Sequence, residues 1–168
     1  MAQITFKNAP IQTSGDVPQP GAPAPQFHLN SKDGTKSLKD FSGKKVIATL
    51  PKIETQTCTM MSHNISKLAA KYPHIPFLIV STDSTNVQMN FCEAQKIDNV
   101  ITLSADIGNP FGTDYGLLMT DGPIKDHLAR SIIVLDENDD VVFAKLVSEI
   151  TQEPNYAEVE PFLKPSIR

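Results

Sequence analysis

Lys45-Val-Ile-Ala-Thr-Leu-Pro-Lys-Ile-Glu-Thr-Gln-Thr-Cys58 is the stretch that decides the fold. Residues 45–50 are apolar and β-branched, which predicts a buried strand. Pro51 ends that strand, because proline cannot donate to a sheet ladder. Beyond Cys58, apolar residues recur at helical spacing, at Met61, Ile65, Leu68, Ala69 and Tyr72. The stretch therefore predicts a strand, a turn and a helix whose first turn directs Cys58 inward.

A cysteine in this position is favoured as the thiolate. The free backbone N–H groups and the positive end of the dipole lie at the N-terminus of a helix. An unperturbed cysteine thiol has a pKa of about 8.5, so without such help little thiolate exists at neutral pH. Thr55, three residues earlier, can cap the helix or aim its hydroxyl at the sulfur. Judged by position alone, Cys58 could also be a small buried hydrophobe.

The composition favours one compact domain over residues 1–168, with a hairpin and a loop in residues 1–25. The chain has 168 residues, 40% of them hydrophobic, and a net charge of -4. No basic stretch suggests nucleic acid, and no apolar run suggests a membrane partner. The first twenty residues lack the apolar core of a signal peptide, so a cytoplasmic location is expected.

The two cysteines indicate chemistry more than structure. Two are too few for a disulfide scaffold, and in a reducing compartment such a pair is more often catalytic or metal-binding. Neither Cys58 nor Cys92 has a close-set Cys or His partner, and the four histidines are scattered at His28, His63, His74 and His127. We therefore expect no metal and no cofactor.

The remaining segments predict an α/β fold. Short strands are expected at 4–6 and 11–13 (as a hairpin), 26–30, 76–81 and 100–103. Helices are expected at 85–95 and 154–163, with one helical turn at 38–41. Strands at 131–135 and 141–146 flank a turn-forming acidic stretch, which predicts a second hairpin. This order predicts a thioredoxin-like three-layer sandwich: a central mixed β-sheet flanked by helices, with an N-terminal β-hairpin extension.

The spacing Pro51-x-x-x-Thr55-x-x-Cys58 resembles the active-site pattern of the peroxiredoxins. Further stretches resemble their thiol peroxidase branch, the atypical two-cysteine peroxiredoxins of bacteria. These are the N-terminal hairpin, Asn90-Phe-Cys92, 99–104, 121–125, 128–130 and 135–139. The resemblance runs through essentially the whole chain, so it is much more specific than the single motif.

This resemblance implies a role for each of five residues. Cys58 would be the peroxidatic cysteine, Cys92 the resolving one, and Thr55 the active-site hydroxyl. Arg130 would be the active-site arginine and Pro51 the shield over the sulfur. From position alone, other roles remain open. Cys92 could simply pack in the core, Arg130 could be a surface charge, and Thr55 could be only a helix cap.

The resemblance also implies the partners. The substrate would be a hydroperoxide, the reductant thioredoxin or a similar dithiol, and the assembly a homodimer. Cys58 and Cys92 lie far apart in sequence on separate predicted helices, and Cα atoms more than ~7 Å apart cannot be bridged. A Cys58–Cys92 disulfide would then need local unwinding, and the resemblance implies such a switch from a fully folded to a locally unfolded form.

The departures from the family pattern are local. Lys52, Ile53 and Glu54 stand where thiol peroxidases usually have Ser-x-Asp, and Gln56 and Thr57 replace a smaller pair. These positions affect the rim of the pocket and the preferred hydroperoxide, not the class of reaction.

Two other functional classes remain. A thioredoxin-like disulfide oxidoreductase normally has a second cysteine just after the first, whereas Met61 and Ser62 follow Cys58. A binding or chaperone role would need neither Pro51 nor Thr55 where they stand.

Overall fold

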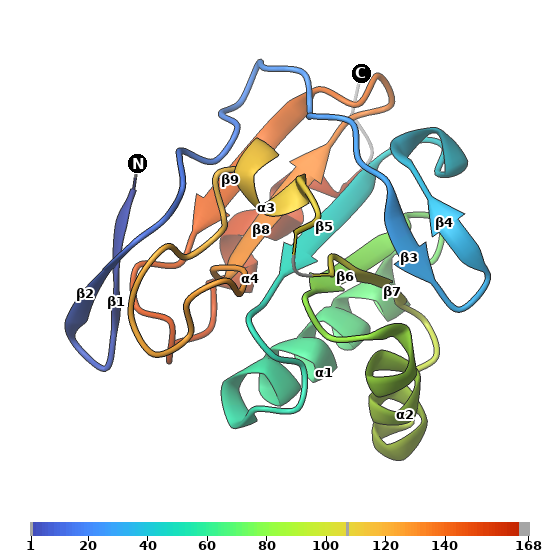
Figure 1. Ribbon diagram of the computed structural model, residues 1–168. Coiled ribbons are helices and arrows are strands. Elements are labelled where there is room, and N and C mark those ends of the chain that lie inside the picture. Colours follow the sequence, from blue (N-terminus) through green and yellow to red (C-terminus); the bar gives the residue numbers. More distant parts are fainter. Residues whose placement is uncertain (1, 107, 165–168) are drawn as a thin grey trace.

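The computed structural model describes residues 2–106 and 108–164. Its centre is a seven-stranded sheet in the order β4-β3-β7-β6-β5-β8-β9 (Figure 1). Three neighbouring strands of the middle run parallel: β5 (Lys45–Thr49), β6 (Phe77–Ser81) and β7 (Ile101–Ser104). Helices connect them, as parallel pairing requires.

Both edges of the sheet are antiparallel. On one side β8 (Ser131–Leu135) pairs with β5, and β9 (Val141–Leu146) pairs with β8. On the other side β3 (Leu29–Ser31) pairs with β7 and with β4 (Gly34–Lys36). The mixed sheet that the sequence predicted is therefore confirmed.

One face of the sheet is covered by α1 (Gln56–Lys71), α2 (Thr85–Gln95) and α4 (Tyr156–Val159). Residues of these helices share an apolar cluster with alternate side chains of the strands, among them Val46 and Ala48. Cys58 belongs to this cluster, so β5, which ends just before the loop that leads to Cys58, contributes side chains to the apolar surroundings of the cysteine.

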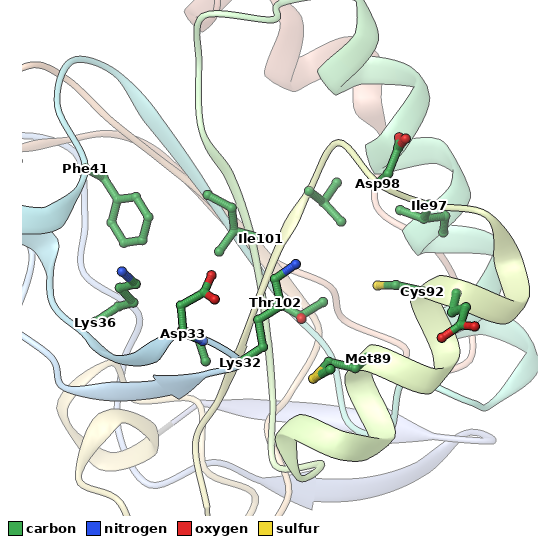
Figure 2. A pocket seen from close by; sticks show the side chains of 13 residues that line it. Lys32, Asp33, Lys36, Phe41, Met89, Cys92, Ile97, Asp98, Ile101 and Thr102 are labelled. Carbon is green, nitrogen blue, oxygen red and sulfur yellow. The ribbon is translucent and has the colours of Figure 1, made fainter.

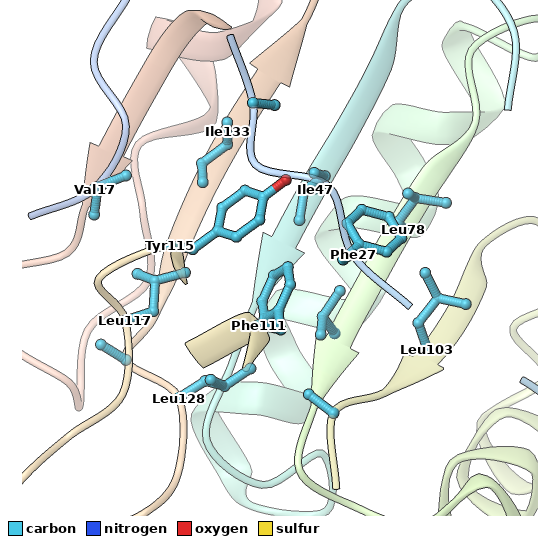
Figure 3. Packing of buried hydrophobic residues seen from close by; sticks show 14 of the residues in the cluster. Val17, Phe27, Ile47, Leu78, Leu103, Phe111, Tyr115, Leu117, Leu128 and Ile133 are labelled. Carbon is cyan, nitrogen blue, oxygen red and sulfur yellow. The ribbon is translucent and has the colours of Figure 1, made fainter. Parts of the chain in front are cut away.

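The opposite face is covered by the short helix α3 (Phe111–Asp114) and by N-terminal loop residues. The rings of Phe111 and Tyr115 stack with centroids 4.4 Å apart, and Phe27 meets Phe111 edge-on. Figure 3 shows these rings over the sheet residues Ile47 and Leu78. A sheet between two covering layers is the three-layer sandwich expected from the sequence.

The structure corrects several predicted elements. The closing helix predicted at 154–163 is shorter than expected and has two parts: α4 is followed directly by the 3-10 helix η2 (Glu160–Phe162). Pro161 accounts for this, because a proline within a helix removes a backbone donor and clashes with the preceding turn. The strand predicted at 26–30 begins only at Leu29, and β4 and α3 were not predicted.

Helix α2 has its predicted bounds, and Ser84 caps it by accepting from the Val87 N–H at 3.3 Å. The apolar residues Val87, Phe91 and Ala94 are spaced to share one face of this helix, but the structure does not bury all three. Ala94 is exposed and the buried side chains are Gln88 and Phe91. Over only three turns, an amphipathic pattern fits neighbouring faces of the helix almost equally well. The spacing alone therefore does not fix which face is buried.

The N-terminal hairpin consists of β1 (Gln3–Phe6) and β2 (Ala9–Gln12) and forms a separate two-stranded sheet. Its turn residues Lys7 and Asn8 both have positive φ, as a two-residue hairpin turn requires. The Glu149 carboxylate holds the hairpin by accepting from Thr5 Oγ1 at 2.8 Å and from the Asn8 N–H at 2.9 Å. Within the described residues, no helix is long and apolar enough to cross a bilayer.

Candidate active site

Cys58 is the third residue of α1 and is 0% exposed. The first helical hydrogen bond runs from the Thr59 N–H to the Thr55 carbonyl, at 2.8 Å. The backbone amides of residues 56–58 precede that bond, so they are not used by the helical ladder. They provide the positive end of the helix beside the buried sulfur.

Arg130 lies immediately before β8 and is only 2% exposed, so it is not a surface charge. Its Nη1 donates to Cys58 Sγ at 3.3 Å and lies 3.5 Å from Met61 Sδ. Its Nε donates to the Ile150 carbonyl at 3.0 Å. A buried guanidinium is costly unless its donors are used, and a thiolate at Cys58 would also supply the opposite charge.

Strand pairing fixes the position of Arg130. Its neighbour Ser131 pairs with Thr49 across β8 and β5, and their hydroxyl oxygens lie 2.5 Å apart. The Thr49 hydroxyl also donates to the Ala129 carbonyl at 2.8 Å. The loop that leads to Cys58 starts at the same end of β5. These bonds therefore hold Arg130 and Cys58 at the same end of the sheet.

The N-terminal hairpin supports the other side of Arg130. The Ile150 N–H donates to the Thr5 carbonyl at 2.9 Å, and the Thr5 N–H donates to the Ser148 carbonyl at 2.8 Å. The carbonyl of Ile150 is the one that Arg130 Nε contacts. Sequence reasoning missed this support, because a backbone carbonyl has no residue-type signal.

Thr55 occupies the N-cap position of α1 but makes no side-chain capping bond. Its hydroxyl instead donates to the Lys52 carbonyl at 2.9 Å, within its own loop. Pro51 is buried at the start of this loop. The Ile53 N–H donates to Asp83 Oδ2 at 2.8 Å, a contact that sequence reasoning also missed.

Cys92 lies on α2 and is partly exposed, in contrast to Cys58, and both are free thiols. Its sulfur faces a pocket of about 590 Å³ between the β3–β4 hairpin and α2 (Figure 2). Burial raises the pKa of the Cys92 thiol, and the nearby Lys32 ammonium partly offsets that rise. Lys32, Phe41, Met89 and Ile101 are among the other residues of the pocket wall.

Two of the four histidines make hydrogen bonds away from Cys58. His63 Nε2 is hydrogen-bonded to Gln95 Oε1 at 2.8 Å, joining α1 to α2, and His127 Nδ1 is bonded to the Thr82 hydroxyl. In the part of the chain that the structure describes, no three His, Cys, Asp or Glu side chains are grouped so that they could hold a metal ion.

The chain also matches known proteins. Residues 19–159 match the Redoxin family model. A thiol peroxidase of Leptospira interrogans is 35% identical over 93% of this chain and 94% of its own length. A thiol peroxidase of Mycobacterium bovis is 39% identical, with the same coverage of both chains. The chain belongs to the thiol peroxidase branch of the peroxiredoxins.

Solved structures agree with this family. A peroxiredoxin-like protein from Aquifex aeolicus is 30% identical and superimposes with a TM-score of 0.89, covering 97% of this chain and 96% of the other. A thiol peroxidase from Chromobacterium violaceum has the same TM-score at 21% identity, covering 96% and 94%, and shows the common fold. The resemblance read from the sequence is confirmed over nearly its whole length.

Proposed function

We propose that this protein is a thiol-dependent peroxidase that reduces hydrogen peroxide and organic hydroperoxides at Cys58. The observation that carries the proposal is the 3.3 Å hydrogen bond from Arg130 Nη1 to Cys58 Sγ inside the apolar cluster. A guanidinium in that place stabilises a thiolate, and it also remains available to a peroxide oxygen that approaches the sulfur.

In the first half-reaction the Cys58 thiolate attacks one peroxide oxygen. The O–O bond breaks, the sulfur is oxidised to a sulfenic acid, and the other oxygen leaves as hydroxide or alkoxide. A helix N-terminus contributes about 0.3–1 kcal/mol to the thiolate, and a hydrogen bond to a charged group about 1.5–3 kcal/mol. Arg130 and the Thr55 hydroxyl would position the peroxide, and Pro51 would shield the sulfur from water.

In the second half-reaction Cys92 resolves the sulfenic acid. The Cys92 sulfur attacks the Cys58 sulfur, water leaves, and an intramolecular disulfide forms. Thioredoxin or a similar dithiol would then reduce the disulfide and become oxidised itself. Support for this division comes from exposure: Cys58 is enclosed, whereas Cys92 borders an open pocket that a protein thiol could reach.

The proposed cycle also bears on the compartment and the assembly of the protein. A cycle that returns both cysteines to thiols needs a reducing compartment, for which the cytoplasm is the proposal. The homodimer implied by the family resemblance stays a prediction, and sedimentation at several concentrations would test it.

The deciding experiment combines the protein with hydroperoxide, thioredoxin, thioredoxin reductase and NADPH. We expect NADPH to be consumed in proportion to peroxide by the wild type but not by Cys58→Ser. A disulfide oxidoreductase would instead reduce a protein disulfide such as that of insulin and leave peroxide unconsumed. That second result would contradict the proposed function.

A further inference from the structure

Asp83 links the two segments that carry the cysteines. It lies between β6 and α2, one residue before the Ser84 cap of the helix that contains Cys92. Its Oδ2 accepts from the Ile53 N–H at 2.8 Å, and Ile53 lies in the loop that leads into the Cys58 helix. One carboxylate thus joins the two helix starts.

Both ends of this link are anchored. The Ile53 side chain is 0% exposed and packs in the same apolar cluster as Cys58. The Asp83 carbonyl accepts from the Ser104 hydroxyl at 2.6 Å, which ties it to the end of β7. The bond therefore fixes the loop that leads into α1 to the turn that precedes α2, and it opposes any unwinding of the first turn of α1 that displaces Ile53.

Away from its start, α2 is held to the rest of the fold by few buried side chains and by the His63–Gln95 hydrogen bond to α1. Its buried side chains are Gln88 and Phe91, whereas α1 buries six. Gln88 Nε2 donates to Ser81 Oγ and to the Leu103 carbonyl, but its Oε1 is buried and has no hydrogen-bond partner. A helix with so little buried apolar surface opens at low free energy, so the contacts at its start carry much of its stability.

We propose that Asp83 is a positioning residue for the resolving step: its bond to Ile53 holds the Cys58 and Cys92 segments folded, and its release lets them unwind together. This inference rests on the proposed function, because it concerns the passage from sulfenic acid to disulfide. The bond sets how long the oxidised Cys58 remains enclosed before Cys92 can reach it.

The consequence is a competition at the sulfenic acid. Cys92 attack gives the disulfide, whereas a second peroxide gives sulfinic acid, which leaves the cycle. A stronger Asp83–Ile53 bond prolongs the state in which the oxidised Cys58 is enclosed, and so favours the sulfinic acid. A weaker Asp83–Ile53 bond favours formation of the disulfide.

The test is Asp83→Ala against the matched control Asp121→Ala. Asp121 also accepts from a backbone amide, the Gln12 N–H at 2.9 Å, but at the N-terminal hairpin. After a pulse of one equivalent of peroxide, quenched samples are analysed by mass spectrometry. We expect the Cys58–Cys92 disulfide to form about tenfold faster in Asp83→Ala, with less sulfinic acid at high peroxide and no such change in the control.

The wild type separates this proposal from the one it rests on. If the wild type forms no Cys58–Cys92 disulfide, the proposed function fails. If the wild type forms this disulfide and Asp83→Ala forms it at the same rate or more slowly, the proposed role of the Asp83–Ile53 bond is wrong. A merely structural role for Asp83 would slow peroxide consumption and disulfide formation alike, which would also overturn the proposal.

A second variant and an activity-independent measurement guard against misfolding. Asp83→Asn keeps an acceptor oxygen without the charge, so we expect an increase in disulfide rate between those of the wild type and Asp83→Ala. In the reduced protein, hydrogen exchange at residues 51–61 and 85–95 should rise together in either variant and stay unchanged in Asp121→Ala. A rise in only one of the two segments would show that Asp83 does not couple them.

Discussion

Arg130 Nη1 lies 3.3 Å from Cys58 Sγ, and both side chains are almost completely shielded from water. Little water reaches this pair, so the interaction is screened less than it would be at the surface. The Ile150 carbonyl accepts from Arg130 Nε, and Nη1 also contacts the thioether of Met61. The contact therefore fixes the guanidinium in one direction beside the sulfur.

The first prediction separates the roles of the two cysteines. Cys58→Ser should abolish peroxide reduction, because a serine hydroxyl stays protonated and is a poor nucleophile. Cys92→Ser should consume about one equivalent of peroxide and then stall with Cys58 as sulfenic acid or further oxidised, as mass spectrometry can measure. Equal turnover by Cys92→Ser and the wild type under thioredoxin recycling would remove Cys92 from the mechanism.

The second prediction concerns Arg130. Arg130→Met should slow peroxide attack at pH 7 by about tenfold or more, because a charge-assisted hydrogen bond is worth about 1.5–3 kcal/mol. The rate should stay low at high pH, where the thiolate forms without help. Lys145→Met, which removes an exposed cation on β9, is the control. Recovery of the wild-type plateau at high pH would mean that the arginine does not hold the peroxide.

The third prediction is that oxidation loosens both cysteine segments. Hydrogen exchange at 55–61 and 87–95 should rise in the disulfide form, whereas β5 and β8 in the sheet centre stay protected. Non-reducing electrophoresis after peroxide treatment should show a monomer, because the proposed Cys58–Cys92 bridge lies within one chain. A mainly cross-linked dimer would show that resolution occurs between subunits, while leaving the peroxidase activity in place.

The fourth prediction concerns acid stability through Glu149. Burial alone would raise the pKa of Glu149, but hydrogen bonds from Thr151, Asn8 and Thr5 outweigh it and hold the pKa at about 2. The folded pKa lies below the unfolded value, so this stabilisation is present above about pH 4.5 and is lost as the pH falls towards 2. Glu149→Gln should therefore lower the melting temperature at pH 7 and flatten its decline in acid.

The control for Glu149 is Glu137→Gln, which changes an exposed carboxylate in the β8–β9 turn. Thermal unfolding of the three proteins at pH 7, 4 and 2.5 gives the comparison. If Glu149→Gln and Glu137→Gln melt alike at every pH, the carboxylate does not anchor the N-terminal hairpin.

Much of the fold was predictable because its signals are local. The β-branched run at 45–50, the proline that ends it and the helical stripe after Cys58 each depend on neighbouring residues, and β5 and α1 follow them closely. The β8–β9 hairpin was predicted with its correct bounds for the same reason. Errors fell on short or weakly patterned elements, such as β4, α3 and the segment after Pro154.

The sequence by itself determined the α/β class, the position of Cys58 in the first turn of a helix, and the family, because each is written in adjacent residues or in spaced motifs. Only the tertiary structure decided that Arg130 is buried against the sulfur, that the Ile150 carbonyl orients it, and that Asp83 ties the Cys58 loop to the Cys92 helix. These contacts join residues far apart in the chain, and two of them use backbone atoms that every residue possesses. Folding of the whole chain brings such groups together, so no local sequence pattern predicts these contacts.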